Sequence, residues 1–219
     1  GARPQFIKAA SLSQEINRHP ENQLFEIIIH TGQHYDYKMS EKFFEELGIP
    51  RPKYNLEISG GTHGENSGRM IENIEKVLIK ENPDLVILYG DTDSTLSGAI
   101  AASKLYIPIA HVEAGLRSFN RRQPEEINRV ITDHLSDICF APTDQAVFNL
   151  EKEGISKNKI IRTEDVMADT ARIFGEQSNG QTNLLNEHSI QKNKFILSTI
   201  HREENTNNIK RLENILSSL

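Results

Sequence analysis

Apolar residues along this 219-residue chain follow two spacings, and the spacings predict strands that alternate with helices. Short apolar runs bounded by turn residues are typical of buried strands, whereas apolar residues three and four positions apart indicate one face of a helix. We expect strands at residues 24–30, 84–90, 107–112, 137–141, 159–163 and 195–200. We expect helices at residues 1–18, 40–47, 66–80, 93–105, 124–135, 143–153, 166–174 and 209–219. This order predicts an α/β fold with a doubly wound parallel sheet and right-handed crossovers.

One stretch joins a predicted strand end to a predicted helix start. Glu113 directly follows a strand, and the next helix begins at Pro124, with Glu125 in its first turn. Glu125 and Arg129 are four residues apart, so they share a helix face. The predicted core stripe on the opposite face consists of Ile127, Val130, Ile131, His134 and Leu135. The stretch therefore brings carboxylates and guanidinium groups together, which suits acid–base chemistry on a negatively charged ligand.

Two further strand ends carry groups suited to catalysis. Asp91 follows the strand at residues 84–90, and His201 follows the strand at residues 195–200. Ligands of open parallel sheets bind in a crevice outside the carboxyl ends of the strands. We therefore expect Asp91, Glu113 and His201 to contribute to one active site.

Composition narrows the range of functions. A net charge of −6 argues against a general nucleic-acid binder, and the longest apolar runs have the length of a strand, so we expect no membrane span. The single cysteine, Cys139, lies in an apolar run, which predicts a buried thiol in a reducing, cytoplasmic compartment. No Cys/His cluster has zinc spacing, so we expect no metal site.

The ends of the chain are atypical of a complete protein. The chain starts at Gly1 without an initiator methionine and ends at Leu219 inside an apolar-periodic helix. We expect a fragment in which residues 1–165 form a Rossmann-like domain without its first strand. Residues 166–219 would then begin a second, incomplete domain.

The residues after the strand at 84–90 allow a second interpretation. An aspartate in an Asp-x-Asp-x-Thr segment after an apolar run, here Asp91, is also the nucleophile motif of haloacid-dehalogenase-like phosphotransferases. That motif usually opens its domain, and the expected later lysine and acidic pair are not found in convincing positions. This phosphotransferase remains a minor alternative.

Six segments together resemble the non-hydrolysing UDP-N-acetylglucosamine 2-epimerases, in order and at the spacing of that family. They are GARPQFIK at 1–8, TGQH at 31–34, GDTDST at 90–95, HVEAGLR at 111–117, PEEINR at 124–129 and HREEN at 201–205. The resemblance covers essentially the whole chain. It implies a two-domain, glycosyltransferase-B-like fold with the sugar nucleotide bound between the domains.

The resemblance also implies a chemistry and a set of site residues. The family removes the C2 proton and eliminates UDP from a UDP-2-acetamido sugar, which gives a 2-acetamidoglucal. It then adds UDP back and returns a proton to the other face of C2, with no metal, nicotinamide or other cofactor. Residues that match its catalytic groups are Asp91, Glu113, Glu125 and His201; those that match its substrate-binding cations are Arg3, Lys8, Arg117 and Arg129. The resemblance further implies a homodimer.

The substrate is left open between two branches of the family. The segments at residues 1–8 and 60–64 look closer to relatives that act on UDP-2,3-diacetamido-2,3-dideoxyglucuronate than to those that act on UDP-N-acetylglucosamine. A sugar-nucleotide-binding or glycosyl-transfer module of the same fold is an alternative of another class, because fold alone does not fix function.

Overall fold

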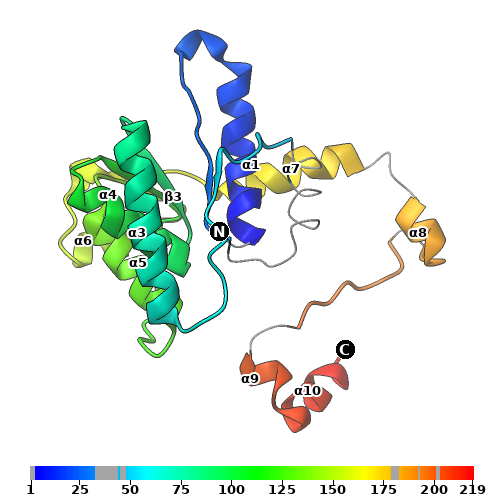
Figure 1. Cartoon of the computed structure of the whole chain (residues 1–219). Coiled ribbons are helices and arrows are strands. Elements are labelled where there is room, and N and C mark those ends of the chain that lie inside the picture. Colours follow the sequence, from blue (N-terminus) through cyan, green and yellow to red (C-terminus); the bar gives the residue numbers. More distant parts are fainter. Residues whose placement is uncertain (1–2, 33–43, 45–47, 179–182, 192, 201–202) are drawn as a thin grey trace. The chain divides into compact units, whose positions relative to one another are not determined.

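The computed structural model of this chain describes residues 3–32, 44, 48–178, 183–191, 193–200 and 203–219. The chain forms two compact units, Gly1–Phe174 and Gly175–Leu219 (Figure 1). The larger unit contains the strands and all of the predicted site residues except His201. The predicted division into domains at residue 165 stays a prediction.

A parallel sheet of four strands forms the centre of the larger unit. The strands are β3 (Val86–Tyr89), β4 (Ile109–Val112), β5 (Ile138–Ala141) and β6 (Ile160–Arg162), hydrogen-bonded in the order β3-β4-β5-β6. All three pairings are parallel, and Tyr89 lies opposite Val112 at the carboxyl ends of β3 and β4. The predicted α/β class with parallel strands is confirmed.

Four helices gather around this sheet; the first precedes β3, and the other three connect its successive strands (Figure 1). They are α3 (His63–Glu81), α4 (Asp93–Lys104), α5 (Pro124–Leu135) and α6 (Asp144–Lys152). Helix α3 begins three residues earlier than predicted because Thr62 forms a capping box with Glu65. The Thr62 side chain accepts from the Glu65 amide, and the Glu65 carboxylate accepts from the Thr62 amide.

Small residues in α4 allow that helix to lie close to the sheet. A Cβ added at Gly98 would approach Leu88 Cδ2 to 2.7 Å, so a larger residue would require the Leu88 side chain to shift. The apolar core between α3, α4 and the sheet consists of Ile58, Met70, Ile74, Leu78, Leu88, Ala99, Ala101, Ala102 and Ile109. A second cluster beneath α6 consists of Ala114, Cys139, Ala141, Ala146, Leu150 and Ile155.

The orientation of α5 differs from the prediction. The expected core stripe is wrong, because Ile127 is 45% exposed and Ile131 is 38% exposed. The buried residues of α5 are instead polar, and they are Glu126, Asn128, Thr132 and Asp133. Three of these side chains hydrogen-bond to the turns at the sheet, as described below, so hydrogen bonding and not apolar burial sets the helix rotation.

The segment before β3 forms less regular structure than predicted. Of the predicted strand at residues 24–30, only β1 (Ile29–His30) is paired, in parallel with β2 (Tyr54–Asn55). Phe25 is 92% exposed, because the residues before β1 pair with no neighbouring strand in the described part of the chain. Apart from residue 44, the predicted helix at residues 40–47 lies outside the described residues.

The first and last helices of the larger unit contact each other. Helix α1 (Arg3–Arg18) confirms the predicted first helix, and a short 3₁₀ helix, η1 (Pro20–Asn22), follows it. Thr170 of α7 (Val166–Ser178) donates a hydrogen bond to the carbonyl of Ile7 at 3.1 Å. A second 3₁₀ helix, η2 (Lys157–Lys159), precedes β6.

The regular structure described in the smaller unit is helical. It contains α8 (Asn183–Glu187), α9 (Glu203–Thr206) and α10 (Ile209–Leu216). The predicted strand at residues 195–200 does not form, because no partner strand is present among the described residues. Within the described ranges, no helix has the length and apolar character needed to cross a membrane.

Candidate active site

The carboxyl ends of β3 and β4 bring two predicted catalytic segments together. The Gly90 amide donates to the carbonyl of Val112 at 3.1 Å, which continues the strand pairing into the turns. Gly90 has a φ of +66°, and a Cβ added to it would lie 3.6 Å from Glu113 Oε2 and 3.3 Å from Lys8 Nζ. Glu113 and Lys8 therefore lie against the turn that carries Asp91.

Lys8 and Glu113 form an ion pair at this edge of the sheet. Lys8 projects from α1, its side chain is largely buried, and its ammonium group donates to Glu113 Oε2. Burial lowers the pKa of Lys8, and the negative charges of Asp91 and Asp165 partly oppose this shift. Helix α1 thus supplies a desolvated cation to the site.

Arg129 of α5 binds the carboxylate of Asp91. Its Nε and Nη2 atoms lie 3.0 and 2.6 Å from Asp91 Oδ2. Its remaining terminal nitrogen, Nη1, donates to Glu126 Oε2 at 2.8 Å. Asp91 keeps 32% of its side chain exposed, so it is held by a cation and still open to a ligand.

Glu126, which the sequence interpretation did not select, holds the loop between β4 and α5. Its carboxylate accepts from the amides of Ser118 and Phe119, both at 2.9 Å, and from Arg129. Burial alone would raise the pKa of Glu126, but these hydrogen bonds hold it below its usual range. The neighbouring Glu125 is exposed and contributes none of these contacts.

Asn128 was also missed by the sequence interpretation. Its side-chain amide donates to the carbonyl of Asp91 at 2.9 Å and to Asp93 Oδ1 at 3.1 Å. The other oxygen of Asp93 lies 2.7 Å from His63 Nδ1 at the start of α3. Asparagine is a poor residue for a helix interior, and this was the signal that could have drawn attention to position 128.

A chain of four ionisable groups lies behind the two turns, and three of the four side chains are buried. His111 contacts the carbonyl of Gly90 and Asp133 Oδ1, at 2.7 and 2.6 Å. Arg117 lies 2.7 Å from Asp133 Oδ2 and also binds both oxygens of Glu153. Burial would lower the pKa of Arg117, but the charges and hydrogen bonds of Glu153 and Asp133 raise it overall. With 1% of its side chain exposed, Arg117 contacts protein carboxylates, and its predicted role in substrate binding stays a prediction.

The contacts described above do not place two further predicted site residues, Arg3 and His201, at the candidate site. Arg3 is described only as the first residue of α1, and His201 lies outside the described residues. Of the eight predicted site residues, the structure therefore brings Lys8, Asp91, Glu113 and Arg129 together directly.

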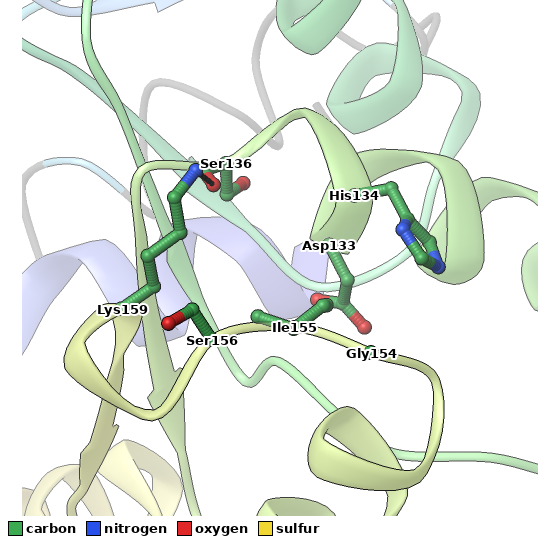
Figure 2. A pocket seen from close by; sticks show the side chains of 7 residues that line it. All are labelled: Asp133, His134, Ser136, Gly154, Ile155, Ser156 and Lys159. Carbon is green, nitrogen blue, oxygen red and sulfur yellow. Dashed lines mark hydrogen bonds between the residues drawn. The ribbon is translucent and has the colours of Figure 1, made fainter.

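A cavity of about 230 Å³ lies away from this cluster, near the amino ends of β5 and β6 (Figure 2). It is lined by Asp133, His134, Ser136, Gly154, Ile155, Ser156 and Lys159. Lys159 Nζ donates to the carbonyl of Ser136 at 3.1 Å. Neither Asp91 nor Glu113 lines this cavity, so the candidate site is the open cluster at the carboxyl ends of the strands.

Comparisons with known proteins show which family this chain is similar to. The family model described as UDP-N-acetylglucosamine 2-epimerase matches residues 14–219. A Methanococcus maripaludis protein, "UDP-N-acetylglucosamine 2-epimerase homolog", is 56% identical, and the match covers all of this chain and 60% of that protein. The UDP-2,3-diacetamido-2,3-dideoxy-D-glucuronate 2-epimerase of Pseudomonas aeruginosa is 53% identical over the same shares.

A solved structure extends the likeness to the fold. The crystal structure of Methanocaldococcus jannaschii UDP-GlcNAc 2-epimerase in complex with UDP-GlcNAc and UDP is 45% identical, with a TM-score of 0.84. The match covers 98% of this chain and 59% of that chain, so this chain spans about 60% of the length of its relatives. The predicted glycosyltransferase-B-like α/β fold class is confirmed, and the haloacid-dehalogenase alternative has no support. The chain belongs to the UDP-N-acetylglucosamine 2-epimerase family.

Proposed function

We propose that the whole protein epimerises a UDP-2-acetamido sugar at C2 by elimination and re-addition of UDP. The observation that carries this proposal is the pairing at neighbouring strand ends, where Asp91 is bound by Arg129 and Glu113 by Lys8. Each carboxylate thus lies beside a cation and close to the other. Such a set combines groups that transfer a proton with groups that stabilise negative charge.

The proposed reaction has two balanced halves. A carboxylate removes the proton from C2, the C1–O bond breaks, and UDP leaves with the bonding electrons, which forms a 2-acetamidoglucal. UDP then adds back at C1, and a proton returns to C2 on the opposite face. Epimerisation requires acid–base groups that can approach both faces of C2, which accounts for more than one carboxylate.

Roles are proposed for the individual residues on this basis. Asp91, Glu113 and Glu125 are the acid–base carboxylates, and His201 is a further catalytic group. Lys8, Arg129, Arg3 and Arg117 bind the substrate, with the anionic diphosphate as their natural partner. The burial of Lys8 and its lowered pKa support a role close to the reacting atoms.

Two substrates follow from the relatives. UDP-N-acetylglucosamine is the first, because the family model and the Methanocaldococcus jannaschii complex carry its name. The 53% identity to the Pseudomonas aeruginosa enzyme favours UDP-2,3-diacetamido-2,3-dideoxy-D-glucuronate as the second. Parallel assays with both sugars, compared by kcat/KM, decide between them.

The proposal includes a homodimer that works in the cytoplasm. The outward face of α5 supports the dimer, because Ile127 and Ile131 are exposed on a helix whose buried face is polar. A second copy of the chain would remove this apolar surface from water. Sedimentation of wild type and of an Ile127→Asp variant tests this part of the proposal.

A Glu113→Gln variant of the whole protein tests the epimerase against a simple binding module. We expect turnover to fall by about 100-fold or more, because acid–base groups contribute about 10²- to 10⁴-fold. Binding of the UDP-sugar, measured by calorimetry, should remain within about 3-fold, since the change removes a proton-transfer group and keeps its shape. Glu151→Gln, on the exposed face of α6, is the matched control. Unchanged turnover by Glu113→Gln would contradict the proposed role.

A further inference from the structure

His111 lies between the turns that follow β3 and β4. Its ring is completely buried, with Nε2 2.7 Å from the carbonyl oxygen of Gly90 and Nδ1 2.6 Å from Asp133 Oδ1. The second oxygen of Asp133 accepts from the Gly115 amide at 3.1 Å. A continuous path of buried hydrogen bonds therefore runs from Gly90 through the imidazole and the carboxylate to Gly115.

The chemistry of the partners fixes how the imidazole is used. A carbonyl oxygen can only accept, so Nε2 carries a hydrogen and donates it to Gly90. Burial would raise the pKa of Asp133, but hydrogen bonds and charge from His111 and Arg117 hold it below its usual range. Because the carboxylate is ionised, Nδ1 also donates, and the ring joins its two partners through both of its N–H groups.

The turn after β4 needs such support because its backbone is strained at Glu113. Glu113 has a φ of +76°, a region that non-glycine residues rarely adopt and that costs free energy. Gly90 and Gly115 have φ values of +66° and +81°. Strained residues persist where surrounding contacts determine their conformation, and the path through His111 and Asp133 supplies those contacts.

We propose that His111 and Asp133 are positioning residues that fix the spacing between Asp91 and Glu113. We call the hydrogen-bonded path from Gly90 through His111 and Asp133 to Gly115 the bridge. Asp91 directly follows Gly90, and Glu113 lies two residues before Gly115, so each carboxylate is close in sequence to one end of the bridge. Neither His111 nor Asp133 is exposed to a ligand, because both side chains have 0% exposure. They act through the backbone that carries the carboxylates. This inference rests on the proposed function.

Kinetics of His111→Gln and Asp133→Asn in the whole protein test the effect on catalysis. We expect kcat to fall by about 10- to 100-fold with KM within about 3-fold, because small misplacements of reacting groups cost rate more than binding. Thr132→Val is the matched control, since its buried hydroxyl has no hydrogen-bond partner in the described part of the chain. A folded His111→Gln enzyme with the kcat of wild type would overturn the proposal.

Nuclear magnetic resonance of the unsubstituted 219-residue chain tests the bridge without a variant and without activity. We expect two protected ring N–H signals from His111, one for each partner. A single ring N–H signal would overturn the proposal. In folded variants, the amide signals of Asp91 and Glu113 should shift, whereas Thr132→Val should leave them in place. If this chain shows both ring signals but the whole wild-type protein does not epimerise either sugar, the bridge stands as a structural feature and the proposed function fails.

Discussion

Arg129 holds Asp91 by one carboxylate oxygen only. Its Nε and Nη2 atoms both contact Oδ2, at 3.0 and 2.6 Å, and among the described residues no side chain hydrogen-bonds Oδ1. The cation thus fixes the carboxylate and leaves its second oxygen available to a ligand. This arrangement fixes the orientation of the Asp91 carboxylate.

Asp91→Asn should lower kcat by about 100-fold or more, because the amide cannot take up a proton and Arg129 loses its charged partner. Initial rates of epimer formation measure the effect. Asp84→Asn is the control, since Asp84 is exposed at the amino end of the same strand segment. Equal loss of activity in both variants would show that the effect is not specific to the candidate site.

Glu125 and Glu126 form a matched pair of adjacent carboxylates with different roles. Glu126→Gln should lower the free energy of unfolding by about 2 kcal/mol, because a buried charged acceptor loses strong hydrogen bonds. Glu125→Gln should leave stability within about 0.5 kcal/mol and lower turnover instead. Urea unfolding and initial rates on both variants separate the two roles. Similar destabilisation by the two changes would contradict the assignment.

Helix α5 shows both what the sequence predicts and where it fails. Pro124 and the acidic first turn predicted the start of the helix correctly, because these signals are local. The predicted rotation of the helix was wrong, because Ile127 and Ile131 have the spacing of a core stripe but are exposed. The polar side chains that are in fact buried satisfy amides and carbonyls of distant turns, and a sequence does not reveal such partners.

The site itself was predicted in part. Asp91 and Glu113 closely follow β3 and β4, so the parallel pairing of these strands alone brings both residues to the same edge of the sheet. Lys8 comes from a helix about 80 residues before Asp91, so its distance along the sequence does not place it beside the two carboxylates, and the resemblance to the family suggested its role. The bridge through His111 was missed, because a histidine in an apolar strand gives no signal of its buried partner.

Acid should destabilise the protein through Glu126 and Asp133, whose folded-state pKa values lie below their usual ranges. Because these pKa values are lower in the folded state, the unfolded chain binds protons more readily than the folded chain. The stability that these two carboxylates contribute is therefore fully present above about pH 5 and is lost as the pH falls below about 4. Urea unfolding of wild type and Glu126→Gln at pH 7 and pH 4 measures the effect. The difference in unfolding free energy should be smaller at pH 4, and an unchanged difference would contradict the depressed pKa of Glu126.

Alanine substitutions at Gly115 and Gly154 distinguish the loss of stability caused by a strained backbone from the loss caused by a steric clash. Both have positive φ values, +81° and +86°, but a Cβ at Gly115 would lie 2.4 Å from the carbonyl oxygen of Ala146, whereas the space at Gly154 is open. Gly154→Ala should cost about 1 kcal/mol of stability. Gly115→Ala should cost about 2 kcal/mol more, because the turn would be forced away from α6. Equal unfolding free energies for the two variants would contradict the close packing of this turn.

Removal and return of the C2 proton can be followed by proton nuclear magnetic resonance in D₂O. The whole protein would be incubated with UDP-N-acetylglucosamine and, in parallel, with the diacetamido uronate. We expect a manno-configured product that carries deuterium at C2, and Glu113→Gln should slow its formation by about 100-fold or more. An epimer that retains the original C2 proton, or no reaction with either sugar, would rule out epimerisation by elimination and re-addition of UDP.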